Sequence, residues 1–149
     1  MSKNQGPAPR SLTEQELGAL IAAQQFGVLA TVQRSGHPAM STVLYRWVPT
    51  ERVIRISTTA ERLKAKQVRT NSRVALHVSG PDVWSFAVAE GDAEVSDRPE
   101  ELLAYAGYPA AHAGYPEDAA AFLAEQRAEG RVVITIEVAR IYGTALDVS

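Results

Sequence analysis

The fold is decided by residues 26–48, FGVLATVQRSGHPAMSTVLYRWV, in which two apolar runs flank a short polar turn. Runs rich in β-branched and aromatic residues predict strands, here at 26–33 and 38–48. In the turn at 34–37, Gly36 can take a positive φ. Pro38 fits the first position of a strand, because proline has no N–H to donate to the ladder. The stretch therefore predicts an antiparallel hairpin.

Similar runs predict four further strands, at 53–58, 73–79, 83–95 and 131–142, the third of them bulged near Gly91. Helices are predicted at 13–25, where Thr13 and Glu16 form a capping box, at 99–105, and at 117–129, with Gly130 as the C-cap. A short basic helix ends near residue 70. Six strands without regular β-α-β alternation predict a mainly β (α+β), mostly antiparallel barrel with flanking helices.

The composition restricts the class of protein. The chain has 149 residues, a formal net charge of −2 and no cysteine. We expect one domain at 11–149 after a flexible leader at 1–10, and no disulfide or thiolate metal site. The charge argues against nucleic-acid binding, and the absence of a long apolar run argues against a membrane span or signal peptide. We therefore expect a cytoplasmic protein.

The clearest functional signal lies in residues 54–66, IRISTTAERLKAK, a predicted strand that leads into the basic helix. Arg62, Lys64 and Lys66 stand near the helix N-terminus, where positive side chains are unfavourable unless an anion binds there. Hydroxyls of Ser57 and Thr58 precede them. The segment predicts a site for a phosphate-bearing cofactor. The alternative is a solvated basic face. The helical spacing of Arg62, Lys66, Arg69 and Arg73 along one stripe favours the functional interpretation.

Other chemical signals are weak. The chain has no nucleotide-binding glycine loop, no HExxH and no GxSxG elbow, and its three histidines are far apart. We therefore predict neither a catalytic side chain nor a metal site. Tyr45, Trp47 and Trp84 could form an aromatic wall beside a flat ligand, or could be core or interface anchors.

Several motifs, in order, resemble the pyridoxamine-phosphate-oxidase-like split β-barrel flavoproteins of the FMN-binding type. The motifs are FGVLATV (26–32), GHP (36–38), STV (41–43), STTAERLK (57–64) and NSRVAL (71–76). WSFAVAEG (84–91) and RIYG (140–143) are similar to one branch, the actinobacterial deazaflavin reductases that use coenzyme F420. The resemblance implies a six-stranded split barrel.

The resemblance also implies a homodimer with two cofactor sites at the subunit interface. Arg62, Lys64 and Lys66 would hold the cofactor phosphate, assisted by Ser57 and Thr58. The ring would be lined by residues of the second strand and by a tryptophan of the partner subunit: Pro38, Met40, Ser41, Thr42, Val43 and Trp84. No protein nucleophile is required, because the ring carries the hydride chemistry.

The function that this resemblance implies is an oxidoreductase that passes hydride from reduced F420 to a small, electron-poor organic acceptor. One alternative keeps the fold but binds FMN, as an oxidase or flavin reductase. A second alternative is a non-enzymatic binder of F420, flavin or haem. The region 99–130 is expected to shape the substrate pocket.

Overall fold

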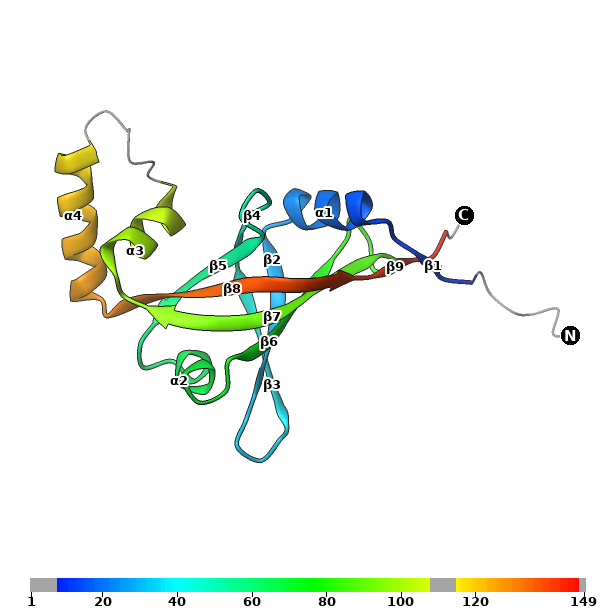
Figure 1. Cartoon of the computed structure of the whole chain (residues 1–149), viewed down its shortest axis with the longest axis horizontal. Helices are drawn as coiled ribbons and strands as arrows, with labels where there is room; N and C mark the ends of the chain where they lie inside the picture. The colour runs from blue at the N-terminus through cyan, green and yellow to red at the C-terminus, as the bar shows by residue number, and fades with distance from the viewer. Residues whose placement is uncertain (1–7, 108–114, 148–149) are drawn as a thin grey trace, which may run out of the picture.

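The computed structural model describes residues 8–107 and 115–147, with side chains of the second range from residue 119 onward. Seven strands form one antiparallel sheet in the order β3-β2-β6-β7-β8-β5-β4 (Figure 1). They are β2 Phe26–Val32, β3 Pro38–Leu44, β4 Arg46–Val48, β5 Val53–Thr59, β6 Arg73–Ser79, β7 Phe86–Ser96 and β8 Arg131–Tyr142. The predicted split barrel is confirmed in its class, its antiparallel arrangement and its approximate strand count.

The sheet closes through one short piece of chain. Its two edge strands, β3 and β4, are consecutive in sequence and are separated only by Tyr45. The strand predicted at 38–48 is thus interrupted once. The Tyr45 N–H donates to the Gln25 carbonyl at 3.0 Å, and the buried Tyr45 hydroxyl donates to the Ile21 carbonyl at 2.6 Å. The chain therefore leaves β2 at Tyr45 and pairs next with β5.

The barrel interior is apolar. Strand alternation sends every second side chain inward, where it is shielded from water. The largest fully buried strand side chains of this core are Leu29, Ile54, Ile56, Leu76, Val78, Ile134 and Ile136. Thr31 of β2 and Thr58 of β5 are polar exceptions, only 2% and 5% exposed.

Helix α1 (Glu14–Ala23) covers one end of the barrel with Leu17 and Ile21. The predicted capping box is present: the Glu16 N–H donates to the Thr13 hydroxyl, and the Thr13 N–H donates to the Glu16 carboxylate. Residues Arg10–Ser11 (β1) pair with Thr144–Ala145 (β9) beside this helix. The predicted leader falls mostly on residues 1–7, outside the described part.

The bulge predicted in β7 is confirmed, because the register with β8 shifts between Glu90 and Gly91. A Cβ at Gly91 would stand 1.9 Å from the Glu137 carbonyl oxygen, so only glycine fits there. The strand begins at Phe86 rather than at residue 83. Trp84 therefore lies in the preceding loop, whose Ser85 makes only an isolated bridge to Ala145.

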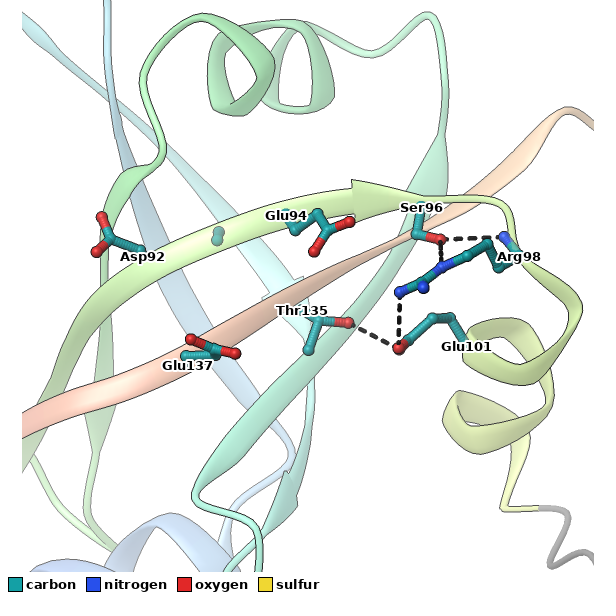
Figure 2. Close-up of a pocket in the computed structure, with 8 residues that line it drawn as sticks. Asp92, Glu94, Ser96, Arg98, Glu101, Thr135 and Glu137 are labelled. Atoms are coloured by element: carbon teal, nitrogen blue, oxygen red, sulfur yellow. Dashed lines mark hydrogen bonds and ion pairs between the residues drawn. The ribbon is translucent and has the colours of Figure 1, made fainter.

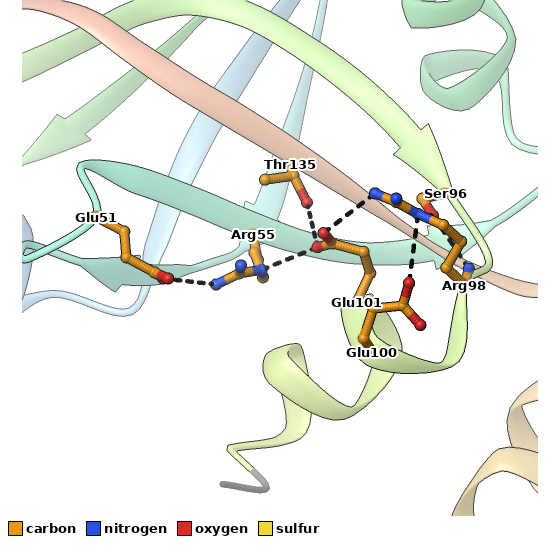
Figure 3. A network of polar contacts seen from close by, with 7 residues as sticks. All are labelled: Glu51, Arg55, Ser96, Arg98, Glu100, Glu101 and Thr135. Carbon is orange, nitrogen blue, oxygen red and sulfur yellow. Dashed lines mark hydrogen bonds and ion pairs between the residues drawn. The ribbon is translucent and has the colours of Figure 1, made fainter. Parts of the chain in front are cut away.

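The predicted helices of the region 99–130 are confirmed as α3 (Pro99–Ala106) and α4 (Tyr115–Ala128), with Gly130 after α4 at φ 68°. Glu101 of helix α3 makes polar contacts with the outer faces of β5 and β8 (Figure 3). Its carboxylate accepts from the Arg55 guanidinium at 3.2 Å and from the Thr135 hydroxyl at 3.1 Å. In the described ranges, no helix is long and apolar enough to cross a bilayer.

Candidate functional site

The basic helix predicted after β5 is α2, Leu63–Thr70, with Arg62 as its N-cap. It has no side-chain cap. Within the described chain, the Leu63 and Lys64 N–H groups have no backbone acceptor, as is usual in a first turn. The helix end thus combines free N–H donors with two neighbouring cationic side chains, a favourable arrangement for an anion.

A depression of about 170 Å³ lies between this helix end and the β2–β3 hairpin. Arg62, Lys64 and Gln67 come from the helix side, and Met40 and Ser41 come from β3. Thr31, Ala39 and Leu63 complete the lining. The structure therefore brings together four residues that the sequence assigned to cofactor binding, namely Met40, Ser41, Arg62 and Lys64.

The cations at this end of the molecule lack counter-ions. Five arginines elsewhere form ion pairs with carboxylates, namely Arg10, Arg55, Arg98, Arg131 and Arg140, although not every arginine outside the site does so. In contrast, Arg34, Arg62, Lys64 and Lys66 make no side-chain hydrogen bond or ion pair with any described residue. Their charge is available to a bound anion.

The electrostatics of Lys64 agree with this interpretation. Partial burial lowers its pKa below the usual 10.5, and the positive charge of Arg62 lowers it further. Both effects disfavour the ammonium form while no anion is bound. A phosphate beside Lys64 would reverse the second effect, because opposite charges favour ionisation.

The remaining predicted site residues lie outside this depression. Lys66 is on the other side of α2, in an adjoining depression. Pro38 and Thr42 are exposed on β3, whereas Val43 is buried in the core. On β5, Ser57 is half-buried and Thr58 is buried. The predicted basic stripe also ends early, because Arg73 belongs to β6 and not to α2.

Trp84 is far from α2 within one chain. Helix α2 runs into the Arg73 end of β6, and the loop that holds Trp84 follows the opposite end, after Ser79. The seven residues of β6 separate the two by roughly 20 Å. Trp84 is 47% exposed, so its ring can contact another molecule.

The other two aromatic candidates have structural roles. Tyr45 is part of the core, and burial raises its pKa to about 12. Trp47 packs against the core and lines a depression beside α1. Neither lines the depression that contains Arg62, so the core interpretation holds for both.

Sequence reasoning missed Thr31 and Gln67. The Thr31 hydroxyl donates to the Gln67 side-chain oxygen at 2.5 Å, which ties α2 to the barrel wall. Each residue carried a usable signal. Thr31 is a polar residue at an inward position of β2, and Gln67 follows Lys64 by three residues, which places both on one side of a helix.

The outer surface of β3, β2, β6 and β7 carries apolar side chains on adjacent strands, toward the end that holds Phe26 and Leu44. Phe26 and Leu44 are opposite one another and are 60% and 45% exposed, and Met40 is 66% exposed. On the next strands, the His77 and Phe86 rings stack at 5.1 Å. Exposed large apolar side chains on neighbouring strands are typical of an interaction site.

A larger depression of about 350 Å³ lies beside α3 but has the opposite charge (Figure 2). Its lining includes four carboxylates, Asp92, Glu94, Glu101 and Glu137, with Arg98 as a single cation. Repulsion between carboxylate and phosphate makes it unsuitable for an anionic cofactor. Across the described residues, no group of three or more potential ligands could hold a metal ion.

The single curled antiparallel sheet and its flanking helices define a protein of the split-barrel class. The profile of the pyridoxamine 5′-phosphate oxidase family matches residues 13–145, and the chain belongs to this family.

Solved structures agree on the fold. An FAD-binding protein from Mesorhizobium loti superposes with a TM-score of 0.67 at 21% identity, over 91% of this chain and 96% of that chain. An F420 reductase superposes with a TM-score of 0.62 at 23% identity, over 87% of this chain and 98% of that chain. The General Stress Protein 26 from Bacillus anthracis superposes with a TM-score of 0.62 at 17% identity, over 91% of this chain and 94% of that chain. At these identities the similarity establishes the fold alone.

Proposed function

We propose that the protein binds a phosphate-bearing flavin or deazaflavin cofactor at Arg62 and Lys64. The observation that carries this proposal is that Arg62 and Lys64, two cations without ion-pair partners, lie together at the N-terminus of α2. Met40 and Ser41 line the same depression. Charge-assisted hydrogen bonds from such a pair, together with free backbone N–H groups, suit a phosphate. The family supports a flavin-type ligand, and the F420 reductase neighbour supports the deazaflavin form.

We further propose that two copies pair through the apolar outer surface of β3, β2, β6 and β7. Pairing would remove Phe26 and Leu44 from water and would cover the cofactor ring beside Met40. It would also bring Trp84 of one protomer toward the site of its partner, a contact that the fold forbids within one chain. The cofactor site would then be complete only in the dimer.

The proposed activity is reduction of a small, electron-poor organic acceptor. A reduced deazaflavin, when bound, supplies the hydride, and the acceptor also takes a proton from solvent. The chain's own residues bind the phosphate, orient the ring and exclude water. FMN is the second candidate, because it too offers a phosphate to Arg62 and Lys64.

A paired fluorescence titration with F420 and FMN, followed by an acceptor screen with reduced F420, tests this function. We expect F420 to bind more tightly and to be oxidised when an acceptor is present. Tight FMN binding with weak F420 binding would move the protein to the flavin alternative. Binding without turnover would indicate a carrier.

Replacing Lys64 with arginine should change the pH dependence of cofactor binding. Because the pKa of Lys64 is lowered, its charge is lost on the alkaline side at a lower pH than for an ordinary lysine. Affinity of the wild type should therefore fall as the pH rises toward 10.5. The affinity of the Lys64→Arg variant should stay constant over that pH range, since a guanidinium keeps its charge. Identical profiles would contradict a role for Lys64 in phosphate binding.

A further inference from the structure

A second depression of about 250 Å³ adjoins the proposed phosphate site, on the other side of α2. The two share Leu63 and Gln67, which are one helical turn apart and form a ridge between them. Val32, Gln33, Arg34, Lys66 and Thr70 complete the lining of the second depression. One ligand can therefore occupy both depressions if it crosses this ridge.

The second depression has its own pair of cations, from two different elements. Arg34 comes from the turn between β2 and β3, and Lys66 comes from α2. No carboxylate lines the depression, and neither cation is ion-paired within the described chain. Two unpaired positive charges across one small depression favour an anionic occupant.

Helix geometry separates the two cation pairs. Lys64 and Lys66 are two positions apart, so their side chains leave the helix about 200° apart. Lys66 therefore lines the second depression, whereas Arg62 and Lys64 line the first. The ridge between them is fixed, because the Thr31 hydroxyl holds the Gln67 side chain. The two cation pairs thus lie in two separate depressions.

We propose that Arg34 and Lys66 form a second anion subsite, specific for a flavin-type cofactor that carries an anionic group beyond its first phosphate. The inference rests on the proposed function. Two ligand chemistries supply such a group: the second phosphate of a flavin dinucleotide, and the carboxylates of a deazaflavin side chain. FMN, with one phosphate, leaves the subsite empty.

The test is a binding titration of the full chain with FMN, FAD and F420, using the wild type and the Arg34→Gln/Lys66→Gln variant. The matched control is Arg52→Gln/Arg127→Gln, which removes the same charge from exposed positions away from α2. We expect FAD or F420 to bind the wild type more tightly than FMN does. The double variant should bind that ligand on the order of tenfold more weakly, and its affinity for FMN should change less than twofold. The control variant should bind FMN and the larger ligands with the affinities of the wild type.

The outcomes separate this inference from the proposed function. Equal weakening of FMN and of the larger ligands would overturn the second subsite but leave the cofactor site intact. Binding of FMN alone would also overturn it. A selective loss of affinity for FAD would assign the subsite to the second phosphate of a flavin dinucleotide. A selective loss of affinity for F420 would assign it to the carboxylates of the deazaflavin side chain. If no ligand binds the wild type, the inference and the proposed function both fall.

Discussion

The Arg62→Ala/Lys64→Ala variant is expected to lose cofactor affinity by about 10²–10⁴-fold, because each charge-assisted phosphate contact contributes on the order of 1.5–3 kcal/mol. Both side chains line the same depression and neither supports the core, so the variant should fold normally. Fluorescence titration with F420 or FMN measures the affinity, and thermal unfolding monitors the fold.

Two comparisons make this result specific. The charge-conserving Arg62→Lys/Lys64→Arg variant should retain most of the affinity, although the altered geometry can weaken a bidentate contact. The Arg52→Ala/Arg127→Ala variant, which loses the same charge on other elements, should bind as the wild type does. If the alanine variant of Arg62 and Lys64 binds normally, the phosphate lies elsewhere.

The second large effect is expected from the Phe26→Glu/Leu44→Glu variant, which places two like charges opposite one another on the apolar sheet surface. Both side chains are exposed, at 60% and 45%, so the substitutions leave the barrel interior unchanged. Burying the carboxylates between two copies would be strongly unfavourable. The variant should be a monomer, and its cofactor affinity should fall because Trp84 of the partner no longer reaches the site.

Light scattering coupled to size-exclusion chromatography gives the mass, and circular dichroism checks the fold. The control is Ala22→Glu/Ala124→Glu, which adds the same charge at exposed positions of α1 and α4 and should remain dimeric. A wild type that is monomeric with cofactor bound would contradict the shared site. A variant that remains dimeric would place the interface on another surface.

The sequence predicted the barrel well because its signals are local. Strand alternation, the capping box at Thr13 and the glycine bulge at Gly91 each reflect a short-range constraint that the tertiary structure keeps. The interruption at Tyr45 could not be predicted, since it depends on carbonyls of Gln25 and Ile21 that only the folded barrel brings near. The same is true of the closure of β3 onto β4.

The sequence predicted an anion site from residue types, and the structure shows which of those residues lie together. The residue types of Arg62 and Lys64 pointed to an anion, and the structure places them together. Spacing alone put Lys66 with them, whereas the ridge of Leu63 and Gln67 separates it. The contributions of Thr31 and Gln67 depend on the packing of α2 against β2, a contact between segments far apart in the sequence.

The most direct test of the central claim is a crystal structure of the protein with F420 or FMN bound. The account predicts phosphate oxygens within about 3 Å of the Lys64 ammonium and the Arg62 guanidinium. It also predicts the ring beside Met40 and the partner's Trp84, across a two-fold interface formed by the apolar sheet surface. A phosphate bound away from α2, or a ring enclosed by one protomer alone, would contradict it.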